Sequence, residues 1–366
     1  MARLLFKEGS FRILSDDVGG LLPQEMNELI KMAGCTSHQT REKTKKTPEE
    51  FIEMIWEIKH YSVLEHSWFS FFLSPFSQTT LKRIGFDLLK ANGLFQVTAE
   101  QDFLLISGNA RIFNEAYSKV IRKKMEGRGL IETLLYELHK ENPVLFHQPE
   151  IGFEESNSFK FYRHRLTRSP LIIKRDDILT HRAMTVEFNN HSRGFTHEDV
   201  RSRNGDEKIT SYTQASTRYV DFAKGQVDLE KFQIKFILPY NNIFDFNQKV
   251  NLEVKGMNYS FTAQEFVDLV EGWYRALRAR GLRPEEARQW LPIGIESQIV
   301  QTYNLREWLH WFYLRTGQAA HPEIRWSAVN LLKEVQRRIP GIFDDFEFGV
   351  KKDGSEYAIY TGNELI

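Results

Sequence analysis

The sequence has 366 residues, 41% of them hydrophobic, which is enough for a buried core in one large or two modest domains. Basic and acidic residues both number 49, so no global charge favours nucleic acid or an anionic membrane, and any phosphate site must be local. The one cysteine, Cys35, excludes an internal disulfide and a cysteine-rich metal site and is typical of a reducing cytoplasm. No apolar run approaches ~20 residues and the N-terminus lacks a signal-peptide core, so we expect a cytoplasmic protein without a membrane span.

Capping residues and apolar spacing predict helices along the chain. Thr47 caps a helix that begins at Pro48 and ends near Lys59. The aromatic run that follows, 67–73, predicts a buried strand. Further helical patterns cover 112–124, 130–141, 262–280, a stretch that opens at Pro284 and a last one from His321.

Two short segments carry side chains suited to an anionic ligand. Thr180-His181-Arg182 supplies an imidazole and a guanidinium. Ser216 and Arg218 stand two residues apart, and both donate hydrogen bonds to phosphate oxygens where they meet them. We expect the two segments to form one site.

The stretch between these segments is polar and is punctuated by Gly194 and Gly205. This composition is more typical of a solvated loop than of a metal site, and we expect a loop or a lid over the active site. It contains, among other ionisable residues, His191, Arg193, His197, Glu198, Asp199, Arg201 and Arg203.

Together the two segments resemble the signature of the flavin-dependent thymidylate synthases, in which Arg-His-Arg is followed closely by Ser-x-x-Glu-x-Ser-x-Arg-Tyr. Here Thr180 stands for the first arginine and Gln214 for the glutamate, and extra residues at about 186–210 separate the halves. A second Arg-His-Arg begins at Arg163, in an alternating pattern that indicates a half-exposed strand, and it remains an alternative.

Two further landmarks resemble the same family. The segment from His60 to His66 is similar to a turn that runs into a strand, which places His60 and Ser62 where the family contacts flavin. Arg288 precedes Leu291-Pro292, as in the family's Arg-x-x-Leu-Pro, whose arginine reaches substrate phosphate. Without the resemblance, Arg288 is a surface helix residue and His60 a helix end.

The segment 302–315 resembles the family's Asn-x-Arg helix. At ~3.6 residues per turn, Asn304 and Arg315 share a face with two tryptophans, while Arg306 and His310 share another. Such a helix suits a subunit interface better than one core and one solvent surface. The alternative is a surface helix with stray charges. Asn109-Ala110-Arg111 echoes Asn304-Leu305-Arg306, but the match is too short to establish a repeat, and an ordinary helix start is the simpler interpretation.

The resemblance implies one catalytic domain over 1–366, of α/β (α+β) class with a mixed sheet and flanking helices, and family-atypical insertions at about 74–158 and 186–210. It implies reductive methylation of dUMP to dTMP, with FAD as cofactor and NADPH and methylenetetrahydrofolate as cosubstrates. It further implies a homotetramer with sites shared between subunits. We expect no metal, nucleic acid or membrane partner.

The resemblance also implies residue roles. Arg315 is the candidate catalytic residue, because a guanidinium beside the N3/O2 edge of a pyrimidine stabilises the negative charge that develops there. The expected substrate-binding residues are Gln214, Ser216, Thr217, Arg218, Arg288 and Arg315. The expected FAD-binding residues are His60, Ser62, His181, Arg182, Gln214, Asn304, Arg306 and His310.

Two alternatives for function stay open. One is a relative that alkylates another pyrimidine nucleotide, such as a cytidylate; the other is an inactive nucleotide-binding homologue, which Thr180 and Gln214 suggest. Gln214 keeps the size of a glutamate but gains an amide donor, so uracil and cytosine can each be satisfied. A nucleophilic role for Ser216 is disfavoured, because no base stands near it in sequence.

Overall fold

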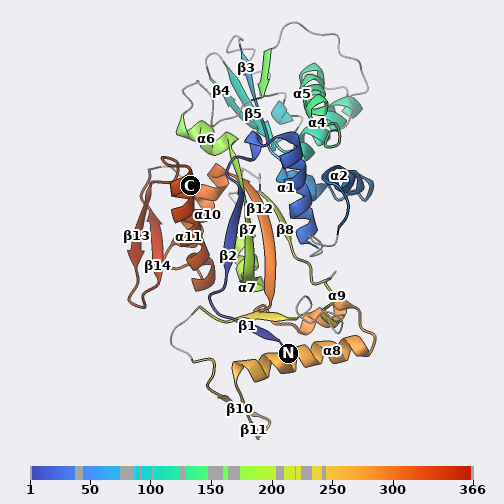
Figure 1. Cartoon of the computed structure of the whole chain (residues 1–366). Helices are drawn as coiled ribbons and strands as arrows, with labels where there is room; N and C mark the ends of the chain where they lie inside the picture. The colour runs from blue at the N-terminus through green and yellow to red at the C-terminus, as the bar shows by residue number, and fades with distance from the viewer. Residues whose placement is uncertain are drawn as a thin grey trace.

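The computed structural model describes residues 2–37, 44–74, 86, 88–90, 92–100, 103–123, 128–146, 160–163, 174–202, 210–218, 220–223, 233–240 and 245–363. Over these ranges the chain forms two four-stranded antiparallel sheets, one above the other, and a smaller unit below them (Figure 1). The α/β class with flanking helices is thereby confirmed, and the parallel pairing in these ranges is between β1 and β9. No helix found there is long and apolar enough to cross a bilayer.

The upper sheet consists, in spatial order, of β4 (Gln96–Ala99), β5 (Leu104–Gly108), β3 (Phe69–Ser74) and β6 (Lys160–Arg163). Its core is shared by α1 (Pro23–Thr36), α2 (Pro48–Glu57), η2 (Tyr61–His66), α4 (Ala110–Lys123) and α5 (Arg128–Glu141), with η1 (Val18–Gly20) at its edge. Edge-to-face aromatic pairs fill it, among them Phe69–Phe146 and Phe95–Phe113, each with 5.0 Å between ring centroids. The predicted helices and the strand after His66 are confirmed.

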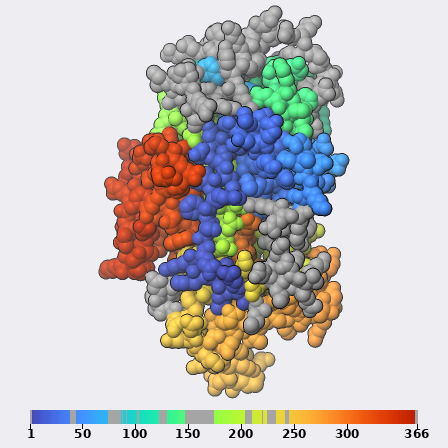
Figure 2. All heavy atoms as spheres, in the orientation of Figure 1, coloured from blue at the N-terminus to red at the C-terminus, as the bar shows by residue number. Residues whose placement is uncertain are grey.

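The central sheet consists of β2 (Ser10–Ser15), β7 (Ala183–Ser192), β12 (Glu296–Asn304) and β8 (Thr210–Gln214). Around it lie α6 (Arg175–His181), α7 (Arg193–Asp199), α10 (Leu305–Thr316), α11 (Pro322–Arg338) and the hairpin of β13 (Phe346–Val350) and β14 (Glu356–Tyr360). The space-filling view shows that N-terminal and C-terminal segments lie side by side here, and β2 contacts α11 (Figure 2).

The tryptophans of α10 are buried inside this chain. Trp308 donates its indole N–H to the Met184 carbonyl (3.0 Å), and Trp311 donates to Asp199 Oδ1 (2.7 Å). Both side chains are fully buried, and they pack with Phe188 in one core. The aromatic face that suggested a subunit interface is therefore explained by packing within the chain.

The lower unit consists of β1 (Arg3–Leu5) beside β9 (Lys235–Ile237), the hairpin of β10 (Val250–Val254) and β11 (Met257–Phe261), and the helices α8 (Ala263–Ala279), α9 (Pro284–Ala287) and η5 (Arg288–Trp290). Thr262 caps α8 by accepting the Glu265 N–H (3.2 Å), and Gly281, with φ of +94°, follows its end. Both predicted boundaries are confirmed.

The prediction of a solvated loop at 186–210 is wrong for residues 186–199. They complete the central strand β7 and form α7, and His191, Thr196 and Asp199 are fully buried. Their polar groups have partners distant in sequence, such as Ser327, whose hydroxyl lies 3.0 Å from His191 Nε2. Residues 203–209 of this stretch, and the residues after Arg163 in the second Arg-His-Arg, lie outside the described ranges.

Two buried histidines join the upper and central sheets. His66, at the end of η2, lies 2.9 Å from both Thr302 Oγ1 on β12 and Thr213 Oγ1 on β8. His181, at the end of α6, lies 2.7 Å from Ser107 Oγ on β5 and 2.8 Å from Thr98 Oγ1 on β4. Burial lowers the pKa of His66 to about 3, so this ring is neutral at physiological pH. Each histidine thus reaches from beside one sheet into the other.

We expect His66→Phe and His181→Phe each to lower the free energy of unfolding by about 1–3 kcal/mol, because each removes the two hydrogen bonds that an imidazole forms with hydroxyls of the other sheet. The measurement is denaturant unfolding at neutral pH. The matched control is His197→Phe, at an exposed position, which should stay within about 0.5 kcal/mol of wild type. Equal stability of all three variants would contradict the role of His66 and His181 in joining the upper and central sheets.

Candidate active site

The C-terminal end of β8 gathers predicted substrate-binding residues. Gln214 ends the strand, and the Ser216 N–H donates to the Ser37 carbonyl after α1 (3.0 Å). Arg288, at the start of η5, donates from Nη1 to Thr217 Oγ1 (3.2 Å). Segments far apart in sequence therefore meet here, as the predicted phosphate-binding set requires.

A guanidinium that the sequence did not assign to ligand binding lies in the same place. Arg193, the first residue of α7, is half-buried and has Nη1 3.5 Å from the Ala215 carbonyl. Burial, together with the positive charge of Arg288, lowers the pKa of Arg193. In the part of the chain that the structure describes, neither arginine forms an ion pair with a carboxylate. Two neighbouring cations without a counter-ion make this end of the sheet suited to an anion.

Arg218 follows Thr217, the residue that Arg288 contacts. Its side chain is exposed, and its backbone N–H donates to Ser216 Oγ (3.3 Å), which fixes the short turn after β8. We call Arg193, Arg218 and Arg288 the arginine cluster.

Gln214 is held from two sides. Its Nε2 donates to Thr196 Oγ1 on α7 (2.6 Å) and to Ser297 Oγ on β12 (3.0 Å). Because both amide hydrogens are used, only its carbonyl oxygen stays available to a ligand. The residue therefore presents an acceptor, as a glutamate does.

Arg315 lies at the opposite end of α7 from the arginine cluster. Its Nε donates to Ser202 Oγ (2.7 Å) and its Nη1 pairs with Glu198 Oε2 (2.8 Å). The seven residues of α7, ~10 Å at 1.5 Å per residue, separate Arg315 from Arg193. Burial raises the pKa of the adjacent Asp199 to about 7.

The first predicted segment lies at the other end of the central sheet. Ala183 pairs with Asn304, whereas Gln214 pairs with Ile299. Five residues of strand, ~17 Å, separate Asn304 from Ile299. The expectation that the two segments form one site is therefore not met within a single chain.

Four of the predicted flavin residues surround the beginning of α10. Asn304 caps the helix and donates from Nδ2 to the Thr180 carbonyl (3.3 Å). Arg306 donates from Nε to Thr180 Oγ1 (3.3 Å) and pairs with Asp176. Nearby, Arg182 donates from Nε to the Asp16 carbonyl (2.7 Å). The fourth, His310, lies one turn after Arg306 on α10.

His181 does not join this group. The side chain is fully buried, and both ring nitrogens have hydroxyl partners in the upper sheet. Its carbonyl accepts from Trp68 Nε1 (2.7 Å) and Ser70 Oγ (2.9 Å). No hydrogen-bonding atom of the ring is left for a flavin in this arrangement, so the FAD contact of His181 stays a prediction that the geometry of this chain does not support.

His60 and Ser62 lie elsewhere, on the exposed start of η2 beside α4. They form no side-chain hydrogen bond within the described ranges, so the structure leaves them accessible but does not bring them to Arg306.

The group around α10 fits a flavin in one specific respect. His310 Nδ1 is buried and has no hydrogen-bond partner in the described part of the chain. Burial, with the charge of Arg315, lowers the pKa of His310, so its ring is neutral and has one free hydrogen-bonding atom. Arg306 adds a cation for a phosphate. No group of three or more potential metal ligands is found in the ranges that the structure covers.

Arg193 and Thr196 are the functional candidates that the sequence missed. They fall in the stretch interpreted as a loop. Arg193 contacts Ala215 and Thr196 contacts Gln214, and these residues are far apart in sequence until β7, β12 and β8 pair in the central sheet. The signal available in the sequence was Ser192, a residue type favoured at the N-cap of a helix, and in the structure its Oγ accepts from the Phe195 N–H (2.9 Å).

Comparison with known proteins gives one family. The family model described as thymidylate synthase complementing protein matches residues 129–341, more than half of the chain. The flavin-dependent thymidylate synthase of Corynebacterium aurimucosum is 32% identical over 193 residues, which cover 51% of this chain and 72% of that protein. The enzyme of the same name from Pyrococcus abyssi is 32% identical over 163 residues, 44% of this chain and 58% of that protein.

Among solved structures, a UMP/dUMP methylase, PolB from Streptomyces cacaoi, aligns with 45% of this chain and 73% of its own, at 20% identity and a TM-score of 0.32. The matching family uses FAD, with NADPH and methylenetetrahydrofolate as cosubstrates, and its members are enzymes of the methyltransferase type. The chain belongs to the thymidylate synthase complementing protein family, as the motifs in its sequence predicted.

Proposed function

We propose that the protein catalyses the flavin-dependent reductive methylation of dUMP to dTMP. The methylene carbon of methylenetetrahydrofolate replaces the hydrogen at C5, NADPH supplies the hydride that completes the methyl group, and tetrahydrofolate and NADP⁺ are released. The observation that carries the proposal is the meeting of Arg193, Arg288 and the Ser216-Thr217 turn at one strand end. Within the described ranges Arg193 and Arg288 form no ion pair with a carboxylate, and guanidiniums beside hydroxyls suit a nucleotide phosphate.

Arg315 is the proposed catalytic residue. Its partner Glu198 lies on α7, the helix that begins with Arg193, so a nucleotide whose phosphate is held by the arginine cluster extends along α7 toward Arg315. A guanidinium there stabilises negative charge on the N3/O2 edge while C5 becomes nucleophilic. Substrate has to replace Glu198 as its partner.

Bound FAD supplies a carrier for the reducing equivalents of NADPH. Arg306 would hold its phosphate groups, and His310 Nδ1 and Asn304 would offer hydrogen bonds. Because these residues and the arginine cluster lie at opposite ends of the central sheet, we propose active sites shared between subunits of a homotetramer, in the cytoplasm.

We expect the purified protein to bind FAD, and Arg306→Ala to weaken that binding roughly 10- to 100-fold, because one charge-assisted contact is lost. Titration followed by flavin absorbance and fluorescence measures both. The control is Arg337→Ala, an exposed arginine on α11, which should bind FAD as wild type does. A protein that takes up no FAD would contradict the proposed flavin-dependent function.

We expect Arg315→Ala to reduce kcat about 100-fold or more with FAD still bound, since its contact is made most strongly to the developing charge. Arg315→Lys keeps the charge but not the planar fork, and should recover only part of the rate. Unchanged turnover in Arg315→Ala would show that another residue carries the charge.

We expect Arg218→Ala and Arg288→Ala mainly to raise the KM for the nucleotide, roughly 10- to 100-fold each, because a phosphate contact is present throughout the reaction. The matched control is Arg283→Ala, an exposed arginine of the same segment, with unchanged KM. A fall in kcat without any change in KM would remove these residues from the phosphate site.

We expect dUMP, rather than dCMP or CMP, to be methylated. The Gln214 carbonyl accepts equally well from uracil N3–H and from the cytosine amine, so the preference rests on Arg315, which suits an edge that becomes negative. Each nucleotide is incubated with reduced enzyme and methylenetetrahydrofolate, and flavin oxidation and nucleotide mass are followed. Product from a cytosine nucleotide alone would change the substrate while leaving the flavin chemistry in place.

A further inference from the structure

The upper and central sheets share one plan. Apart from the edge strands β6 and β2, each sheet has three strands, and the first of these in sequence (β3 or β7) pairs with the third (β5 or β12). The third pairs with the second (β4 or β8). The third strand then runs directly into a helix, α4 or α10, which is followed by α5 or α11. All these strand pairs are antiparallel.

Equivalent residues follow at constant distances along the chain. Those around the first two strands, His66, Ser70 and Thr98, have counterparts 115 positions later in His181, Thr185 and Thr213. Those around the third strand, Ser107, Asn109 and Arg111, have counterparts 195 positions later in Thr302, Asn304 and Arg306. The difference of 80 residues reflects the longer connection from β8 to β12, which contains the lower unit apart from β1.

The counterparts make the same contacts. Asn109 Oδ1 accepts from the Ile112 N–H (3.0 Å), as Asn304 Oδ1 accepts from the Glu307 N–H (2.9 Å). Arg111 pairs with Glu65, and Arg306 bonds to Thr180, the residue 115 positions after Glu65.

The two histidines also correspond, because each one contacts the other copy at equivalent residues. His66 contacts Thr213 and Thr302, and His181 contacts their counterparts Thr98 and Ser107. Each copy thus inserts the same residue into the other, which is the exchange that a two-fold axis produces.

We propose that residues 61–141 and 176–338 are two copies of one unit, and that the first copy has a ligand site of its own, in the cavity beside α4, for an aromatic compound that bears a phosphate. This inference does not depend on the reaction proposed above. The family match covers the second copy and only the last helix of the first.

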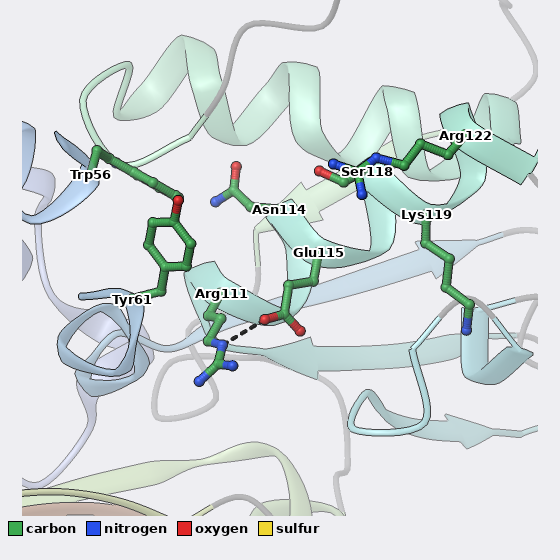
Figure 3. A pocket seen from close by; sticks show the side chains of 8 residues that line it. All are labelled: Trp56, Tyr61, Arg111, Asn114, Glu115, Ser118, Lys119 and Arg122. Atoms are coloured by element: carbon green, nitrogen blue, oxygen red, sulfur yellow. Dashed lines mark hydrogen bonds and ion pairs between the residues drawn. The ribbon is translucent and has the colours of Figure 1, made fainter. Parts of the chain in front are cut away.

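The cavity has a volume of about 480 Å³, within the ~300–1,000 Å³ of ligand pockets. Figure 3 shows Trp56 and Tyr61 at one end and Lys119 and Arg122 at the other, with Arg111 and Glu115 between them. The two aromatic rings are 5.2 Å apart and tilted by 51°. They offer faces and edges against which a planar ring packs.

The charged side chains of the cavity also differ from one end to the other. Arg111 is neutralised, because it pairs with both Glu65 and Glu115 (2.6 Å for Glu115). Lys119 donates only to the Lys90 carbonyl (2.9 Å), and Arg122 is exposed; neither has a carboxylate partner within the ranges described. Free cations at one end and aromatic rings at the other select a ligand with a ring and a phosphate.

The second copy lacks the cations that stand at one end of this cavity. The counterparts of Ser118, Lys119 and Arg122 are Tyr313, Leu314 and Gly317. The two copies therefore keep a common framework but present different surfaces on their first helix. The cations beside α4 are not a requirement of the fold.

The test is calorimetric titration of the full chain with FMN and with AMP, which share the ring and phosphate but distinguish a flavin from a nucleotide ligand. Riboflavin and adenosine are the matched probes without phosphate. We expect saturable binding of FMN or AMP, and at least tenfold weaker binding of the compound without phosphate.

Arg122→Glu should weaken binding of the phosphate compound at least tenfold, and Tyr61→Leu should weaken it while the phosphate dependence stays. Lys249→Glu, an exposed lysine of the lower unit, is the charge-matched control and should bind as wild type does. Arg288→Ala, which alters the substrate phosphate site, should also leave this binding unchanged. Binding that survives Arg122→Glu but is lost in Arg288→Ala, or no saturable binding of either probe, would overturn the proposal; thermal unfolding of each variant checks its fold.

Discussion

The architecture depends on the buried polar junction between the two main sheets. Apolar packing holds each sheet to its own helices, in separate cores around Phe113 and Trp308. Between the sheets, by contrast, two imidazoles link hydroxyls on four strands. A hydrogen bond has a fixed length and direction, so this junction sets register as well as contact. His66 stands just before β3 and His181 just before β7, so each histidine positions a strand of its own sheet.

The central sheet separates two chemically different ends. At one end α7 begins with Arg193, and neither Arg193 nor Arg288 forms an ion pair with a carboxylate in the residues that the structure describes. At the other end Arg306 has Asp176 and Thr180 as partners, and His310 has an unused ring nitrogen. α10 spans much of the distance between them, since Arg306 lies in its first turn and Arg315 in its last. One helix thereby contributes to both ends.

Local signals in the sequence predicted most helices, because a cap is a contact between near neighbours. Thr47, Thr262 and Asn304 each accept the N–H three residues on, and each marks a helix start. The loop prediction for 186–199 was wrong for the opposite reason, because the contacts there are between residues distant in sequence. The buried polar groups of this stretch are satisfied by distant partners, such as Glu323, which accepts from the Ser192 N–H (2.7 Å) and hydroxyl (2.6 Å), so polarity suggested solvent where the strand is central. The same error hid Arg193.

The similarity of Asn109-Ala110-Arg111 to Asn304-Leu305-Arg306 is visible in the sequence, but only the structure shows that it belongs to a repeat. Three residues establish no repeat, because an asparagine cap followed by an arginine recurs by chance at helix starts. Strand order, constant spacing and reciprocal histidine contacts are independent of one another, and together they leave chance a poor explanation. Because both copies stand in one chain, the contacts between them are made within that chain. The first copy is then relieved of the constraints on the second, which accounts for a helix that keeps the fold and carries different chemistry on its surface.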